Sequence, residues 1–220
     1  MTETAVSTGL GRTRDWERYT PLAAPVIAVV LWVIGLILAT DAGDHNKGSQ
    51  ILADYKAHDT EYLVAGLIWS IGVIVFIWFL GHLRTRLLAT EGGDRLAATA
   101  FAGGIAAAIF GLLLPGPDMA GALNKDDIDA SGASTLHHLS DAFFIGAEYV
   151  LPVLLFATGL IALRSLFLPK WFAWVTIVIG ILLLIGPIGW AALIFAFPLW
   201  LIVTGVFLWR AATAAPRSAI

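Results

Sequence analysis

The chain contains no cysteine, and charged residues make up only 13% of its 220 positions. Without thiols it cannot form disulfides, thiolate metal sites or cysteine-ligated iron–sulfur clusters. Its 13 basic residues do not form a run and the net charge is −3, so we expect no nucleic-acid partner. The Walker and dinucleotide glycine patterns, the Gly-x-Ser-x-Gly elbow and the His-Glu-x-x-His pair are also missing. The sequence therefore carries none of the common signatures of soluble enzymes.

Apolar residues dominate instead, at 59% of the chain against about 45–50% in soluble domains. Runs long enough for the roughly 20 residues of a membrane-crossing helix occur at 22–40, 62–80, 96–114 and about 142–163. The run 171–209 has 39 residues, about twice that length, so it must fold back at the Gly-Pro-Ile-Gly segment 186–189. The sequence predicts an all-α, polytopic bundle of six transmembrane helices.

Basic residues are distributed unevenly between these runs. Ten lie in the N-terminal tail, the second and fourth loops and the C-terminal tail, and three lie in the other loops. By the positive-inside rule both termini are cytoplasmic, and the acidic loops 41–61 and 115–140 face outward. This predicts cytoplasmic tails at 1–21 and 210–220 around one transmembrane domain at 22–209. Arginine outnumbers lysine nine to four and alanine is abundant, so we expect a multi-pass protein of a bacterial plasma membrane.

Small residues and tryptophans suggest how the bundle packs. The third run has Gly103, Ala107 and Gly111 on one stripe and Ala100, Gly104 and Ala108 beside it. Small residues at this spacing let membrane helices approach closely, so this run is predicted to be a packing helix. Trp78, Trp171, Trp174, Trp190 and Trp209 fall near predicted interfaces, whereas Trp32, Trp69 and Trp200 lie deeper. The deeper three are expected to fill the core or line a cavity.

Glu148 is the only acidic residue inside any long apolar run. In a bilayer such a residue is costly, and it needs a partner, a proton or a task. If the fourth helix begins before His137, a turn of about 100° per residue places His137, Asp141 and Glu148 in one wedge. We predict these three as catalytic residues, with Glu148 donating a proton that Asp141 or His137 orients. The competing interpretation is structural: Glu148 hydrogen-bonds Tyr62, Ser70 or a backbone carbonyl and ties helices together.

Aromatic residues surround the predicted depth of Glu148. Rings of this kind line apolar cavities and stabilise cations. The candidate substrate-binding residues are Trp69, Phe110, Phe144, Tyr149 and Phe195. Together with the acid they predict a cavity that opens toward the outer face.

The loop before the fourth run partly matches an EF-hand. Oxygen ligands fall at the first, third and fifth positions counted from Asp127, but His138 occupies the twelfth, where a bidentate glutamate is required. Calcium affinity should therefore be poor. The preferred interpretation is that Ser131 or Ser134 caps the fourth helix, with Asp127 and Asp129 near the positive end of its dipole.

The five histidines argue against haem. His45, His58, His137 and His138 lie in predicted outer segments and His82 at a cytoplasmic end, so no two face each other in mid-membrane. We predict no cofactor and no metal. A zinc or manganese site built from outer histidines and aspartates is the minor alternative.

Four short motifs resemble those of small six-span integral membrane proteins of actinobacteria. They are Ile51-Leu52-Ala53-Asp54-Tyr55, Leu139-Ser140-Asp141-Ala142-Phe143-Phe144, Leu168-Pro169-Lys170-Trp171 and Pro187-Ile188-Gly189-Trp190. The resemblance covers nearly the whole chain and implies the six-span fold, but no activity. A looser similarity, in design only, is to small integral-membrane terpene cyclases, which use intramembrane carboxylates as acids.

Three functions stay open on these observations. The first is membrane-embedded acid catalysis on a lipid or isoprenoid, and the second is proton-coupled transport of a small solute. The third is a non-catalytic scaffold or sensor in which Glu148 is structural. The expected partners are membrane lipids, a small apolar substrate and, for transport in particular, a second copy of the chain.

Overall fold

The computed structural model describes residues 18–39, 47–90, 93–165 and 168–214. In these ranges the secondary structure is helical and no strand occurs. The elements are α1 (Thr20–Leu38), α2 (Gly48–Ala57), α3 (Asp59–Leu88), α4 (Asp94–Leu113), α5 (Gly116–Leu123), α6 (Ala130–Arg164), α7 (Lys170–Leu183), α8 (Gly186–Ala191), the π-helical segment η2 (Ala192–Ala196) and α9 (Phe197–Ala214). The prediction of an all-α protein is confirmed.

Five helical segments in the described part are long and apolar enough to cross a membrane. They are Thr20–Leu38, Asp59–Leu88, Asp94–Leu123, Ala130–Arg164 and Gly186–Thr213. A further apolar helix, α7, has 14 residues. At about 1.5 Å per residue its length falls short of a hydrocarbon core of roughly 30 Å. The helices thus have the lengths and composition of a multi-span membrane protein.

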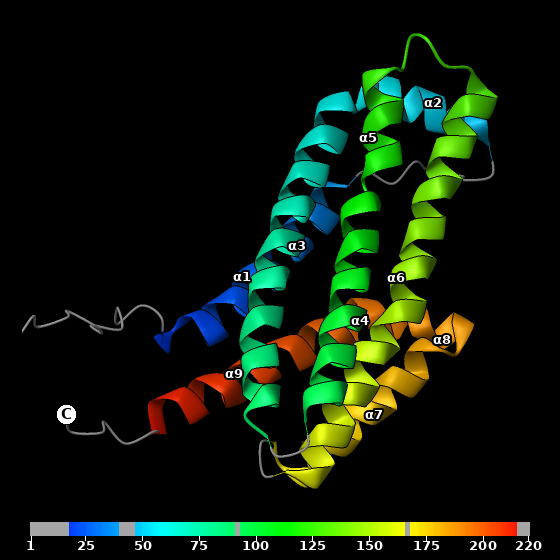
Figure 1. Cartoon of the computed structure of the whole chain (residues 1–220). Helices are drawn as coiled ribbons and strands as arrows, with labels where there is room; N and C mark the ends of the chain where they lie inside the picture. Colours follow the sequence, from blue (N-terminus) through cyan, green and yellow to red (C-terminus); the bar gives the residue numbers. More distant parts are fainter. Residues whose placement is uncertain (1–17, 40–46, 91–92, 166–167, 215–220) are drawn as a thin grey trace, which may run out of the picture.

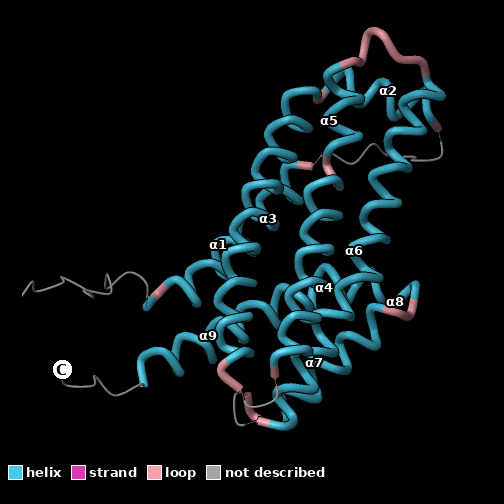
Figure 2. Tube along the Cα trace, in the orientation of Figure 1, coloured by secondary structure: helices cyan, strands magenta, loops and turns pink. Residues whose placement is uncertain are grey.

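The long helices α3, α4 and α6 run side by side, with α1 packed against α3 and α9 crossing beside α1 (Figure 1). The short helices α2 and α5 lie together at one end of these three (Figure 2). The start of α1 and the end of α9 lie near each other, away from α2 and α5. Because α2 and α5 cover one end of the bundle, we call them the cap.

The long C-terminal apolar run folds back, as its length requires. α7 ends at Leu183, the chain reverses at Leu184 and Ile185, and α8 begins at Gly186. Pro187 stands in the first turn of α8, where its missing N–H leaves no helical hydrogen bond unmade. The chain then continues through η2 into α9, so the segment 186–189 starts the returning helix.

The small residues of α4 are buried against two neighbouring helices. A β-carbon on Gly103 would lie 2.8 Å from the backbone nitrogen of Leu154 in α6. A β-carbon on Gly104 would lie 2.6 Å from Leu80 Cδ2 in α3. A larger residue at Gly103 would meet backbone, whereas at Gly104 it would meet a leucine side chain that can move; both contacts confirm that this span packs closely.

Buried residues form two separate clusters. The larger one fills the bundle and includes Trp200, whose indole N–H donates to Thr176 Oγ1 at 2.8 Å. The smaller one lies under the cap and consists of Ile51, Tyr55, Tyr62, Ala122 and Ala133. The cap is therefore held to the bundle by its own small core.

The start of α6 differs from the expectation for its cap. Asp129 is the N-cap residue, and its carboxylate accepts a hydrogen bond of 2.8 Å from the Gly132 backbone N–H. Neither Ser131 nor Ser134 has this role, because both lie inside the first turns of the helix. The carboxylate that resembled an EF-hand ligand is thus used for helix capping.

Candidate functional site

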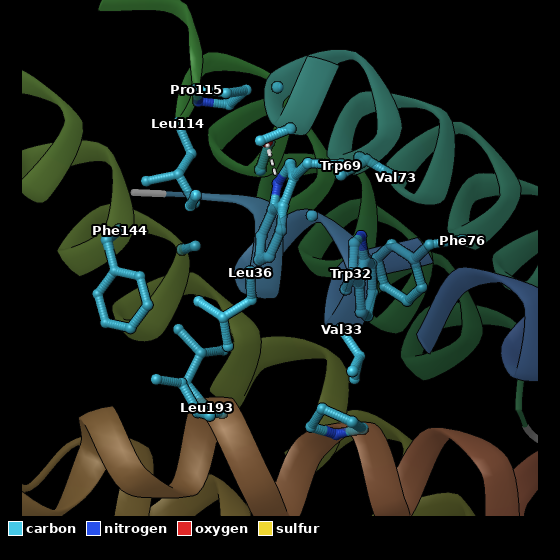
Figure 3. A pocket seen from close by; sticks show the side chains of 18 of the residues that line it. Trp32, Val33, Leu36, Trp69, Val73, Phe76, Leu114, Pro115, Phe144 and Leu193 are labelled. Atoms are coloured by element: carbon cyan, nitrogen blue, oxygen red, sulfur yellow. Dashed lines mark hydrogen bonds between the residues drawn. The ribbon is translucent and has the colours of Figure 1, made fainter. Parts of the chain in front are cut away.

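An apolar cavity of about 330 Å³ lies between α1, α3, α4, α6 and the start of α9. Figure 3 shows Trp69 and Phe76 of α3, Trp32 of α1 and Phe144 of α6 around it. The Trp69 indole N–H donates to the Gly111 carbonyl at 2.9 Å, which fixes that ring against α4. The cavity is thus built mainly from aromatic and aliphatic side chains and suits an apolar molecule.

Aromatic rings continue from this cavity into the core. The Trp32 ring centroid lies 5.9 Å from that of Trp69, 5.7 Å from Phe76 and 6.3 Å from Phe197. Phe197 in turn stacks on Trp200 at 5.7 Å. This confirms the expectation for the deep tryptophans: Trp32 and Trp69 line a cavity, and Trp200 fills the core.

The cavity has a polar end beneath the cap, formed by Asp118 and His137. Asp118 Oδ1 accepts a hydrogen bond of 2.6 Å from the Tyr55 hydroxyl and lies 3.0 Å from His137 Nδ1. Burial, and next the hydrogen bond to Asp118, raise the pKa of the Tyr55 hydroxyl well above its ordinary value near 10. Tyr55 therefore stays a donor, and the carboxylate holds the imidazole in a fixed orientation.

A second space, which we call the cleft, adjoins the cavity and has a volume of about 620 Å³. The cleft is lined by Leu114, Asp118, His137, Ser140, Asp141, Phe144, Ile145, Glu148, Tyr149, Gly186 and Trp190. Leu114, Asp118, His137 and Phe144 line the apolar cavity as well. The polar groups beneath the cap therefore stand on the border between an apolar space and a carboxylate-lined one.

The three acid–base residues predicted from helical spacing do meet at one place. α6 begins at Ala130, ahead of His137, and runs without interruption beyond Glu148. His137, Asp141 and Glu148 all line the cleft. His137 and Asp118 alone among the titratable groups of the cleft, however, also reach the apolar cavity.

Glu148 is buried, with 4% of its surface exposed. Among the described residues its carboxyl group has no hydrogen-bond or ion-pair partner. Tyr62, which the sequence suggested as a partner, instead donates its hydroxyl hydrogen to Asp54 Oδ2 at 2.5 Å. Gly189 of α8 covers the carboxyl group so closely that a β-carbon there would lie 2.1 Å from Glu148 Oε1. Glu148 therefore does not join two helices through a hydrogen bond.

The predicted aromatic residues divide into two groups. Trp69 and Phe144 line the cavity, and Phe144 and Tyr149 line the cleft. Phe110 lines neither space, because its ring fills the gap above Gly146 and lies 6.5 Å from the Phe143 ring. Phe195 lines neither space either: it lies on η2 with 67% of its surface exposed.

The sequence did not single out Asp118, which lies in the predicted outer loop 115–140. The structure places Asp118 on the short helix α5, next to His137. A signal was present, because Pro117 followed by an acidic residue is typical of a first helical turn. A short helix predicted at this place would have indicated that Asp118 can face the bundle.

A second tyrosine–aspartate–histidine set lies at the base of the cap. Asp54 Oδ2 accepts from the Tyr62 hydroxyl, and Asp54 Oδ1 lies 2.8 Å from His58 Nδ1. In the described ranges no three His, Asp or Glu side chains are grouped so that they could hold a metal ion. His45 lies outside the described residues.

Comparison with known proteins gives no relative from which a role could be transferred. No protein-family model matches the chain, and neither a curated protein nor a solved structure shows significant similarity to it.

Proposed function

We propose that this protein is a membrane-embedded enzyme that holds the apolar chain of a lipid or isoprenoid in the apolar cavity and performs acid–base catalysis at the polar end of that chain. One observation carries the proposal: the paired His137 and Asp118 line both the apolar cavity and the cleft. A chain lying in the cavity would have its polar end at these two side chains. Titratable groups at the border of an apolar chamber are a frequent feature of active sites.

The two side chains have distinct roles in this mechanism. His137 exchanges a proton with the substrate, because imidazole changes charge near neutral pH and is the most common general acid or base. Asp118 Oδ1 accepts a hydrogen bond from the N–H at Nδ1 of His137, and this bond sets the orientation of the ring and stabilises the imidazolium form. Phe144 separates the two spaces at this point and guides the chain. Glu148, proposed from the sequence as the proton donor, lines the cleft but not the apolar cavity.

The proposal includes a topology of six spans with both termini in the cytoplasm of a bacterium. The excess of basic residues at the loops and tails on that side supports the orientation. The reversal between α7 and α8 supports α7 as a short fifth span that precedes the last one. In this orientation the cap and the cleft face outward, and α8 begins the sixth span next to Glu148.

A substrate search with matched histidine variants tests the function. Protein purified in dodecyl maltoside is incubated with bacterial polar lipids and with isoprenoid alcohols, and products are sought by mass spectrometry. We expect a product with the wild type and loss of turnover in His137→Gln and Asp118→Asn. The control is His138→Gln, which changes the neighbouring exposed histidine outside both spaces and should retain turnover. Turnover that persists in His137→Gln, or no bound lipid and no product in any preparation, would overturn the proposal.

A further inference from the structure

The buried carboxyl group of Glu148 has no counter-charge in the described part of the chain. It is 4% exposed and lines the cleft, with neither a hydrogen-bond donor nor a cation bound to it. A carboxylate in such a place is unfavourable unless a proton or a cation neutralises it. A ligand that enters the cleft with a positive charge would therefore find its strongest interaction there.

The other side chains of the cleft add negative charge and no permanent positive charge. Asp118 and Asp141 are the other carboxylates, and His137 is the only basic residue in the lining. Lys125 and Lys56 do not line the cleft and have other partners: Lys125 forms an ion pair with Asp59, and Lys56 lies 4.0 Å from Asp126. The field in the cleft thus attracts cations.

Aromatic rings make an organic cation the best match. Phe144, Tyr149 and Trp190 line the cleft together with Glu148. Ring faces attract ammonium groups that have left water, and carboxylates with aromatic rings are the usual surroundings of bound organic amines. On its other side the Glu148 carboxyl group lies against the backbone of Gly189, with no space for even a β-carbon between them. A ligand must therefore approach this carboxyl group from the cleft.

The adjoining apolar cavity indicates that the rest of such a ligand is apolar. Leu114 and Phe144 line both spaces, so an apolar chain in the cavity is continuous with a head group in the cleft. From these observations we infer that the cleft binds an organic ammonium group with Glu148 as its counter-ion, on a molecule whose apolar chain occupies the cavity. This names the polar group of the substrate and rests on the proposed function for the placement of the chain.

Two probes with the same chain and different heads test the inference. Radiolabelled octylamine and octanol are bound to the wild type in dodecyl maltoside, a detergent without an ammonium group, and the two dissociation constants are compared. We expect the amine to bind about tenfold tighter than the alcohol or more, because it alone can pair with Glu148. N-acetyl octylamine, which is uncharged, should bind like the alcohol. Equal affinity for amine and alcohol in the wild type would overturn the inference without any variant.

Matched variants then locate the charge. Glu148→Gln should lose the preference for the amine while its affinity for octanol is unchanged, which also shows that the cavity is folded. Glu61→Gln removes an exposed carboxylate near the same end of the molecule and should keep the preference. An amine preference that survives in Glu148→Gln would overturn the role of this carboxyl group.

The same binding assay identifies the source of the amine and distinguishes a failure of this inference from a failure of the proposed function. Displacement of octylamine by added phosphatidylethanolamine identifies the head group of a membrane lipid, and its failure to displace identifies a free amine. If octanol binds and turnover is found but the amine has no advantage, only this inference fails. If neither probe binds, the apolar cavity holds no chain and the proposed function fails with it.

Discussion

The two buried clusters of this protein are built on different principles. The bundle cluster consists of aliphatic, small and aromatic residues, and within the bundle Gly103 of α4 lies directly against the α6 backbone. The cap cluster has five members, and two of them are tyrosines, Tyr55 and Tyr62. The hydroxyl groups of both tyrosines donate to aspartates. Close packing of apolar side chains dominates in the bundle, whereas the cap combines close packing, in which a β-carbon on Gly121 would lie only 2.3 Å from Tyr55 Cε2, with these directed polar bonds.

This difference explains where the protein can bind a ligand. The apolar cavity lies among the bundle helices, whereas the polar groups at its end are Asp118 of the cap and His137 of α6. The hydrogen bond from the Tyr55 hydroxyl to Asp118 joins α2 to α5. Both the apolar cavity and the cleft include Asp118 of α5 in their lining. The cap therefore combines attachment with a polar lining for the site.

The largest expected effect is on the bundle. Gly103→Ala places a methyl group 2.8 Å from the backbone of α6, so the two helices must separate, and we expect a loss of about 2–3 kcal/mol in the free energy of unfolding. Gly81→Ala is the matched control, because nothing lies within 4 Å of its β-carbon position in α3. It should raise stability slightly through helix propensity. Thermal unfolding in detergent measures both, and equal midpoints would contradict close packing as the source of bundle stability.

A smaller effect is expected at the cap. Tyr55→Phe removes the hydroxyl group that donates to Asp118, which should cost about 1–2 kcal/mol and speed hydrogen exchange of the α2 amides while the α4 amides keep their protection. Unchanged exchange in α2 would show that apolar contacts alone hold the cap.

The same tyrosine gives the cap a dependence on pH. Its pKa is raised in the folded protein, so its contribution is complete below the unfolded value of about 10 and is lost as the pH rises through the raised pKa. Hydrogen exchange of α2 in the wild type should therefore increase in alkali beyond the intrinsic increase. Tyr55→Phe serves as the control and should lack this additional increase, since it has no proton to lose there.

Much of the fold could be predicted because the membrane restricts it. Apolar runs and small-residue spacing are local patterns, and they predicted the helices, the packing role of Gly103 and a reversal within 171–209, although the chain turns at 184–185 and not within 186–189. Helical spacing also brought His137 and Glu148 to one face correctly, since both belong to one uninterrupted helix. Features that depend on a single helix were thus accessible from the sequence.

Features that depend on two helices were not accessible in the same way. Asp118 and His137 are 19 positions apart, and their contact depends on how α5 packs on α6. The orientation of Phe195 depends on the π-helical turn of η2, which shifts the direction of side chains relative to a regular helix. No periodicity in one segment specifies either result.

The smallest expected effect separates the two aromatic residues that the sequence placed in one group. Phe195→Ala removes a ring with 67% of its surface exposed outside both spaces, so we expect a change within about 0.5 kcal/mol in stability and no change in octanol binding. Phe144→Ala removes a ring that lines both spaces and should weaken octanol binding severalfold, because the chain loses apolar contacts at the border. The two dissociation constants are measured in the assay used for the amine. If Phe195→Ala weakened binding as much as Phe144→Ala, the chain would lie along η2 instead of in the cavity beneath the cap.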